Sequence, residues 1–209
     1  MILITGFGPY REELNASGAL VNSLKDELPE SLVHLNEQLA FEVITCDDTS
    51  RETEHQSLEA QLGALLKQYK PELCIHTGQA PPYNKIVVEK IATNSFMREI
   101  IDPERPVGYW SNLPGTEGLQ MALEARHIPA GYSFYAGQHL CNHILYSSLY
   151  LAEKNALGHK SGFIHIPVLP EQVTKKHRDA PCMPVNMTRN ALSIIINHVV
   201  AAHCLDLAR

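Results

Sequence analysis

The sequence lacks the features that mark membrane, secreted and nucleic-acid-binding proteins. Its formal net charge is −6, whereas a nucleic-acid binder normally carries a basic face. There is no run of like charges that would indicate a charged tail, and we find no apolar stretch that approaches the ~20 residues of a membrane span. The first ten residues have neither the basic segment nor the long apolar segment of a signal peptide. We therefore expect no nucleic-acid partner and no membrane partner.

Paired cysteines are also lacking. The chain has five cysteines, an odd number, and they are scattered without a Cys-x-x-Cys pair. A disulfide framework or a cysteine-rich zinc site would need pairs at regular spacing, so both are disfavoured. Unpaired cysteines are typical of a reducing compartment, which predicts a cytoplasmic protein. The five are Cys46, Cys74, Cys141, Cys182 and Cys204.

Several motifs for cofactors and catalysis are absent as well. The segment GFGPYR is not a dinucleotide-binding fingerprint, because Pro9 and Arg11 interrupt it. There is no phosphate-binding P-loop, no Gly-x-Ser-x-Gly elbow and no His-Glu-x-x-His motif. His139 and His143 are four residues apart on a predicted helix, as zinc-binding histidine pairs are, but no carboxylate ligand lies near them in the sequence. We interpret them as ordinary helix residues and predict no metal site.

What the sequence does contain is an alternation of apolar strands and amphipathic helices. A length of 209 residues with 44% hydrophobic residues suits one α/β domain, 1–209. Alternating strands and helices predict a three-layer α/β/α sandwich around a mostly parallel sheet. The segment 94–115, which is rich in proline, is expected to be irregular and is a candidate functional loop. The predicted strands are 1–7, 38–46, 72–78, 85–93, 129–137 and 161–170, and the predicted helices are 17–30 (capped by Asn15 or Ser17), 53–69, 115–127, 139–155 and 184–205.

Cys141 lies in the first turn of a predicted helix, in the stretch YAGQHLCNHILY. Unpaired N–H groups give a helix N-terminus partial positive charge, which favours thiolate over thiol and can hold an oxyanion. Both are needed for cysteine-dependent acyl transfer. Free cysteine is, however, among the most buried residue types, so Cys141 could equally fill the core beside Ile144 and Leu145. The helix alone leaves both interpretations open.

Two further polar residues occupy strands that are otherwise apolar. His165 lies near the carboxyl end of the strand GFIHIP, where α/β proteins bind ligands in a crevice. Glu89 is embedded in IVVEKIA, and a carboxylate on a core strand needs a partner. Each could have a structural role alone, His165 as a hydrogen-bonded core histidine and Glu89 as an edge residue. A Cys–His–Glu triad would explain all three residues together.

These residues belong to motifs that resemble one known family along essentially the whole chain. ITGFGPY resembles a TGFxPF opening, HTGQA an HxGxA turn, VEKIATN an ERxAxN segment, YAGQHLCN an SAGxxLCN segment, SGFIHIPVLPEQ a GFIHxPxxPxQ segment, and PCMPVN a PSM segment before the last helix. The sequence thus resembles the type I pyroglutamyl peptidases, also called pyrrolidone-carboxylate peptidases. The candidate residues also follow the family's order of glutamate, cysteine and histidine.

The resemblance implies removal of an N-terminal pyroglutamyl residue from peptides. Cys141 would attack the carbonyl carbon, His165 would move the proton, Glu89 would orient His165, and no metal or organic cofactor would be needed. The family is cytosolic, has an α/β/α fold and is often oligomeric, which implies a homo-oligomer, a dimer or a tetramer. The residues that match the family's substrate site are Phe7 and Tyr10, whose rings would sandwich the lactam, Asn15, Gln79, and Arg98 with a one-residue shift near the oxyanion site.

Departures from the family motifs fall around the expected substrate pocket. Residues 11–13 (Arg-Glu-Glu) replace a Gly-Gly pair, Pro82 and Tyr83 replace Gly-Arg, and Lys90 replaces an arginine. Residues 45–54 replace an apolar segment that borders the pocket. Two alternatives therefore stay open: a cysteine amidohydrolase of the same scaffold with altered acyl specificity, and a non-catalytic protein that binds a small molecule.

Overall fold

A six-stranded sheet forms the centre of the computed structural model, which describes residues 1–46 and 51–208 and, within 51–55, the backbone alone. The strand order is β2-β1-β3-β10-β4-β9. The pairs formed by β2, β1, β3 and β10 are parallel, while β4 pairs antiparallel with β10 and parallel with β9. The mostly parallel sheet predicted from the sequence is therefore confirmed. The strands are β1 (Ile2–Phe7), β2 (Leu39–Ile44), β3 (Leu73–Gln79), β4 (Ile86–Glu89), β9 (Ala130–Ser133) and β10 (Lys160–Ile166).

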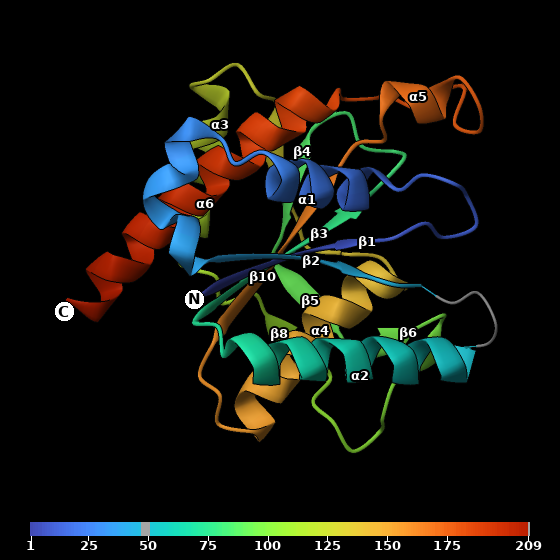
Figure 1. The fold of residues 1–209 in the computed structure, drawn as a ribbon. Coiled ribbons are helices and arrows are strands. Elements are labelled where there is room, and N and C mark those ends of the chain that lie inside the picture. Colours follow the sequence, from blue (N-terminus) through green and yellow to red (C-terminus); the bar gives the residue numbers. More distant parts are fainter. Residues whose placement is uncertain (47–50, 209) are drawn as a thin grey trace.

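Helices cover both faces of this sheet (Figure 1). On one face lie α1 (Ala16–Asp26), α3 (Leu119–Glu124) and α6 (Val185–Leu207), and on the other lie α2 (Arg51–Tyr69) and α4 (Leu140–Lys154). Two separate hydrophobic clusters result, one on each side of the strands. This is the predicted three-layer sandwich. Shorter helices are η1 (Glu30–Gln38), η2 (Thr116–Gly118) and α5 (Pro170–Val173).

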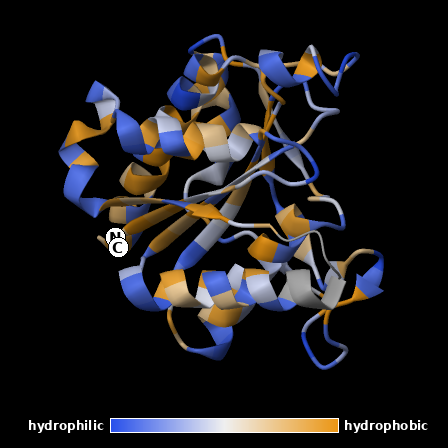
Figure 2. Cartoon of the chain, turned by 45° about the vertical axis from the view of Figure 1, so that its right-hand side comes forward, coloured by the Kyte–Doolittle hydropathy of each residue, from blue (hydrophilic) through white to orange (hydrophobic). Residues whose placement is uncertain are grey.

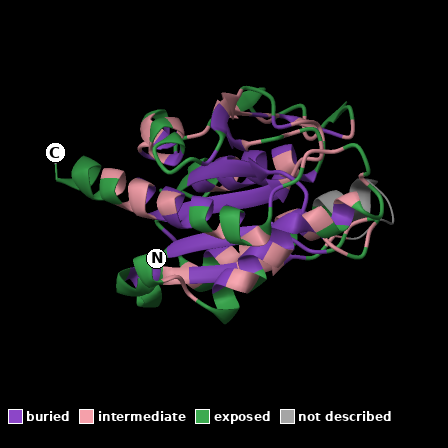
Figure 3. Cartoon of the chain, turned by 90° about the horizontal axis from the view of Figure 1, so that it is seen from above, coloured by how far each residue is buried: buried purple, intermediate pink, exposed green. Residues whose placement is uncertain are grey.

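The central strands are buried on both faces. All six residues of β1 are buried, and so are the first six of the seven residues of β3. The strands therefore read as continuous apolar runs, as expected for a parallel sheet between helices, and they form the hydrophobic, buried centre in Figures 2 and 3. Two polar residues on these strands contact each other: Thr5 Oγ1 lies 2.8 Å from His76 Nδ1 on the neighbouring strand.

Several predicted boundaries differ from those observed. The predicted strand 85–93 is two strands, because the chain leaves the main sheet after Glu89 and forms a separate antiparallel pair. The predicted strand 161–170 ends at Ile166, since Pro167 has no N–H to donate. The segment 94–115 is less irregular than predicted. It contains three short strands, β6 (Ser95–Phe96), β7 (Glu99–Ile100) and β8 (Gly108–Trp110). β6 pairs antiparallel with β7, and β8 pairs antiparallel with β5 (Ile91–Thr93), which lies just before the segment.

Helix α6 corrects one expectation about membranes. Its 23 residues are long and apolar enough, by length and composition alone, to cross a bilayer, and 33% of its most apolar window is buried in this fold. The statement that no stretch approaches that length was therefore wrong. The helix packs against α1 and α3, and its C-terminal end extends away from the body of the molecule (Figure 3).

Candidate active site

Glu89 and His165 meet because of the register between β4 and β10. The antiparallel pairing sets Phe163 opposite Glu89 and His165 opposite Val87. Residues two apart on a strand share a face, so Glu89 and His165 are diagonal neighbours on one face of the sheet. Glu89 is 0% exposed and His165 is 5% exposed. His165 Nδ1 lies 2.7 Å from Glu89 Oε1. Because a carboxylate only accepts, Nδ1–H donates and Nε2 is left for another partner.

Cys141 is the second residue of α4, with His139 at the N-cap. The N–H groups of a first helical turn have no partner within the helix, and the His139 side chain forms no capping bond to them. Asn142 fixes this turn against the strands that follow β4. Its Oδ1 accepts from the Thr93 backbone N–H at 2.8 Å, and its Nδ2 donates to the carbonyls of Thr93 and Ser95 at 2.9 Å and 2.7 Å.

Gly78 provides the space in which the sulfur of Cys141 meets His165. The parallel register of β10 with β3 places Gly78 directly beside His165. A Cβ atom built on Gly78 would lie 2.8 Å from Cys141 Sγ and 2.6 Å from Phe163 Cζ, closer than real Cβ atoms approach. The absence of a side chain at this position therefore lets the helix N-terminus bring its sulfur onto the sheet next to the imidazole.

The environment of His165 favours its charged form. Burial, the largest single influence, lowers the pKa of His165, but the negative charge and hydrogen bond of Cys141, followed by those of Glu89, raise it to about 9. An imidazole between two anionic partners is stabilised as imidazolium. The arrangement therefore places a His165 ring that favours its charged form between the Cys141 sulfur and the Glu89 carboxyl group, as a cysteine nucleophile with a histidine partner needs.

A cavity of about 240 Å³ opens beside Cys141. It contains four of the five predicted substrate residues, Phe7, Tyr10, Asn15 and Gln79, although they come from different parts of the chain. It is also lined by five residues that the sequence analysis did not assign to the site, Arg11, Glu12, Pro81, His139 and Leu140. The sequence analysis noted Arg11 and Glu12 only as departures from the family motifs. Charged residues in place of the family's glycines were the signal that could have assigned them to the site.

Arg98, the fifth predicted substrate residue, lies elsewhere. It is exposed in the turn between β6 and β7, with a φ of 69°, and it does not belong to the residues that line this cavity. The cation that does line the cavity is Arg11, whose guanidinium carbon lies 5.2 Å from the centre of the Tyr10 ring. The positive charge beside Cys141 is thus on the loop after β1.

Gln79 and Glu12, which both line the cavity, form the centre of a hydrogen-bond network. Gln79 Oε1 accepts from the Ala16 N–H at 2.8 Å and from Gln172 Nε2 at 2.9 Å, and Gln79 Nε2 donates to Glu12 Oε1 at 2.6 Å. His177 Nε2 lies 3.2 Å from Glu12 Oε2. These bonds connect the loop after β1 to β3 and α5. Gln79 Nε2 carries two N–H groups, and the bond to Glu12 uses one of them, so one N–H is left.

His139 and His143 do not converge on a common ligand. His143 is 0% exposed and its Nε2 lies 3.9 Å from Glu59 Oε1, whereas His139 lines the Cys141 cavity. Within residues 1–46 and 51–208 there is no group of three or more histidine, cysteine or acidic side chains that could hold a metal ion. Of the segment 45–54, noted as a departure near the pocket, residues 47–50 lie outside the described residues.

Comparison with known proteins decides the family. The family model described as pyroglutamyl peptidase matches residues 1–202. The chain belongs to the pyroglutamyl peptidase family. It is 32% identical to pyrrolidone-carboxylate peptidase 1 of Caldanaerobacter subterraneus over 96% of this chain and 98% of that protein. It is 34% identical to the pyrrolidone-carboxylate peptidase of Brachyspira hyodysenteriae over 93% of this chain and 96% of that protein.

Solved structures of pyroglutamyl peptidase relatives agree with the fold. A mutant pyrrolidone carboxyl peptidase from Pyrococcus furiosus superposes with a TM-score of 0.82 at 28% identity, covering 96% of this chain and 98% of that one. The Thermococcus litoralis enzyme superposes with a TM-score of 0.82 at 25% identity, covering 100% of this chain and 96% of that one. The resemblance inferred from motifs is thus confirmed for the family and for the fold.

Proposed function

We propose that this pyroglutamyl peptidase family member removes the N-terminal pyroglutamyl residue of peptides through a thioester with Cys141. The observation that carries the proposal is the alignment of Cys141, His165 and Glu89 beside a cavity lined by Phe7 and Tyr10. The names of the relatives support the same reaction. The proposed reaction needs no metal and no organic cofactor.

Acylation begins with the thiolate of Cys141. Its electron pair forms a bond to the carbonyl carbon of the pyroglutamyl–peptide bond, and the carbonyl π electrons move onto oxygen. Collapse of this intermediate breaks the C–N bond while His165 gives its Nε2 proton to the departing amine. Water then attacks the thioester with His165 as base, which releases pyroglutamate and restores the thiolate. Glu89 keeps the proton on Nδ1 and stabilises the imidazolium.

The first turn of α4 supplies donors for the oxyanion. The N–H groups of Leu140 and Cys141 are at the helix N-terminus, where they have no intrahelical partner. Removing a single oxyanion donor in a comparable site costs about 10²- to 10³-fold in rate. Arg11, which lines the same cavity, adds positive charge. We assign the oxyanion site to these groups rather than to Arg98.

The cavity suits a small neutral lactam. Phe7 and Tyr10 offer flat apolar surfaces. Asn15 Oδ1 is committed to the cap of α1, accepting from the N–H and the hydroxyl of Ser17, so its Nδ2 is the part left for a ligand. The remaining Nε2–H of Gln79 can donate to the lactam carbonyl. The Tyr83 ring lies 5.6 Å from the His165 ring in an edge-to-face arrangement, so it adjoins the group that gives its proton to the leaving amine.

A peptide pool tests the proposal. Wild-type protein should shorten only peptides that begin with pyroglutamate, each by that residue, as measured by mass spectrometry. Cys141→Ala should lower kcat/KM on a chromogenic pyroglutamyl amide by at least about 10⁴-fold, as loss of a nucleophile does in comparable enzymes. Cys182→Ala, which removes an exposed free thiol, is the matched control and should retain full activity.

Other outcomes would identify the two alternatives. Hydrolysis of other acyl amides, with pyroglutamyl amides untouched, would replace the proposal with an amidohydrolase of altered specificity. Binding of pyroglutamate without turnover, equal in wild type and Cys141→Ser, would replace it with a non-catalytic binding protein. Neither alternative is favoured by the family comparison.

We also propose that the protein acts in the cytoplasm as a homo-oligomer, a dimer or a tetramer. Five free cysteines without a disulfide are compatible with a reducing compartment, and the oligomer rests on the family resemblance. Light scattering after size exclusion would measure the mass; a monomer at micromolar concentration would contradict the oligomer.

A further inference from the structure

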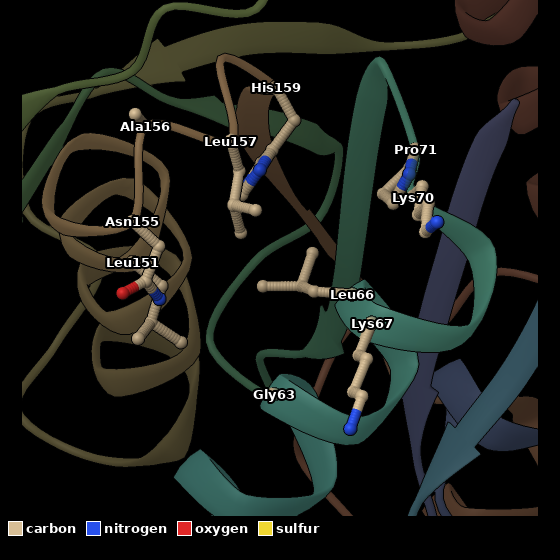
Figure 4. A pocket seen from close by; sticks show the side chains of 10 residues that line it. All are labelled: Gly63, Leu66, Lys67, Lys70, Pro71, Leu151, Asn155, Ala156, Leu157 and His159. Atoms are coloured by element: carbon tan, nitrogen blue, oxygen red, sulfur yellow. The ribbon is translucent and has the colours of Figure 1, made fainter.

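Two cavities of the molecule differ in volume and in polar lining. A cavity of about 590 Å³, larger than the one beside Cys141, lies between the C-terminal ends of α2 and α4 (Figure 4). Gly63 and Leu151 contribute to its wall, and no residue of the proposed triad lines it. In the smaller cavity, by contrast, two polar side chains that are hydrogen-bonded to each other, Glu12 and Gln79, line the same space as Cys141.

Glu12 turns its carboxylate inward, unlike the glutamate that follows it. The Glu12 side chain is 13% exposed, whereas that of Glu13 is 90% exposed. Carboxylates are rarely buried without a partner. Both residues belong to the segment 11–13, which replaces a Gly-Gly pair of the family motif. Because glycine has no side chain, the carboxylate in this cavity is a feature of this chain rather than of the motif.

Within the described residues, the carboxylate of Glu12 accepts from three side chains. Gln79 Nε2 donates to Oε1 at 2.6 Å, and Gln172 Nε2 donates to Oε2 at 3.2 Å. His177 Nε2 is closer to Oε2, at 3.2 Å, than to Oε1, at 3.5 Å. An ionised carboxylate has about four acceptor positions, two on each oxygen. The described donors therefore use both positions of Oε2 and leave one position on Oε1.

Gln79 leaves the complementary donor beside this acceptor. Its Oε1 accepts from the Ala16 backbone N–H at 2.8 Å, which fixes the other end of the amide as the nitrogen that faces Glu12. One N–H of Nε2 is bonded to Glu12, and the second N–H is left. A donor on Gln79 and an acceptor position on Glu12 therefore lie side by side, on two atoms that are 2.6 Å apart.

A lactam presents an edge that matches this pair. The ring forces its amide to be cis, so the N–H and the C=O point to the same side of the ring. An open-chain amide is trans, and its N–H and C=O point in opposite directions. An adjacent donor and acceptor can thus bind both polar groups of a lactam at once, and such paired hydrogen bonds add geometric specificity.

We propose that Glu12 is a specificity-determining residue whose Oε1 accepts the lactam N–H while Gln79 Nε2 donates to the lactam carbonyl. This inference rests on the proposed pyroglutamyl peptidase reaction and assigns the side chain that selects its acyl group. Glu12 binds the ring and takes no part in the proton transfer. Gln172 on α5 and His177, which follows that helix, hold the carboxylate in place.

Two fluorogenic substrates that differ at one ring position test the assignment. The first is pyroglutamyl-7-amido-4-methylcoumarin. The second carries a 5-oxotetrahydrofuran-2-carbonyl group, in which a ring oxygen replaces the lactam N–H and the carbonyl is kept. We expect wild type to prefer the lactam in kcat/KM by about 10- to 100-fold, the effect of one hydrogen bond to a charged group. In Glu12→Ala the ratio of the two kcat/KM values should fall close to one.

Two further variants separate recognition from a structural effect, which would lower both activities and keep their ratio. Glu12→Gln keeps the size of the side chain and one oxygen acceptor, so Tm should stay near that of wild type. Its lactam preference should fall several-fold, because a neutral acceptor binds an N–H less strongly than a carboxylate does. Glu13→Ala removes the exposed glutamate next in sequence and should keep the full preference.

The contradicting results are distinct from one another. A wild-type lactam preference that survives in both Glu12 variants would overturn the role of Glu12 and leave the proposed reaction intact. Equal kcat/KM of wild type on the two substrates would do the same. Wild-type protein that hydrolyses neither substrate would overturn the proposed reaction itself, and the role of Glu12 with it.

Discussion

The two ends of helix α4 each contact a buried histidine, and the two histidines have opposite electrostatics. His165, near Cys141, is 5% exposed, and His159, at the far end, is 2% exposed. The pKa of His165 is raised to about 9, whereas that of His159 is lowered. Burial acts in the same direction on both, against the charged ring. Only His165 has anionic partners, Cys141 and Glu89, whereas His159 contacts the backbone and hydroxyl of Ser148.

Charge partners, rather than burial, therefore separate a proton-transfer group from a neutral acceptor in this fold. The two histidines are six positions apart in sequence, one just before β10 and one near its end. Functional assignment from burial alone would treat them as equivalent. The hydrogen-bond partner of one ring nitrogen decides what the other nitrogen can do.

The largest expected effect on activity comes from removing the Glu89 carboxylate, which His165 has as a partner and His159 lacks. Glu89→Gln keeps the size of the side chain but removes the anion and allows the amide to select the wrong tautomer of His165. We expect kcat/KM to fall by about 10³- to 10⁴-fold, as for the corresponding change in a serine protease triad. Steady-state kinetics measures the fall, and an NMR titration should show a lower pKa for His165.

His159→Gln is the matched variant at the other end of α4. It removes an imidazole of similar burial that has no charged partner, so activity per folded molecule should stay within about twofold of wild type. A large loss of activity in His159→Gln, or wild-type activity in Glu89→Gln, would remove the distinction between the two sites.

The pH dependence of stability should also differ between the two histidines. Because the pKa of His165 is raised in the folded state, its contribution is fully present below about pH 6.5 and is lost as the pH rises through about 9. It amounts to at most about 3 kcal/mol in the free energy of unfolding. Because the pKa of His159 is lowered, its contribution is present above about pH 6.5 and is lost as the pH falls.

Denaturant unfolding between pH 5 and pH 10 checks both directions. The stability difference between wild type and His165→Gln should shrink toward pH 10, and that between wild type and His159→Gln should shrink toward pH 5. Cys141→Ala should reduce the loss of stability at high pH, since Cys141 raises the pKa of His165 more than Glu89 does. Parallel stability curves for wild type and both variants would contradict the assigned shifts.

The sequence predicted the sheet and the layers, and it made Glu89, Cys141 and His165 a candidate triad, because each of these features has a local signature. Apolar runs mark strands buried on both faces, and Glu89 and His165 are conspicuous because such strands rarely hold them. The order of the motifs then supplied the family. Arg11 and Glu12 were not assigned to the site, because their place beside Cys141 depends on how the loop after β1 folds back over β3 and α5, through bonds such as Gln79 Nε2 to Glu12. Arg98 was matched to the family's arginine with a one-residue shift, and that match does not predict which way its turn faces.

Two glycines give the smallest and sharpest contrast between the ends of α4. A Cβ at Gly78 would lie 2.8 Å from Cys141 Sγ, whereas a Cβ at Gly63 would meet nothing within 4 Å. Gly78→Ala should therefore displace the sulfur and lower kcat/KM by about 10²-fold, the cost of a misplacement near 1 Å. Gly63→Ala should leave kcat/KM unchanged and raise the free energy of unfolding by about 0.5–1 kcal/mol through helix propensity. Kinetics and denaturant unfolding of both variants measure this, and equal effects of the two substitutions on activity would mean that the contact at Gly78 does not position the nucleophile.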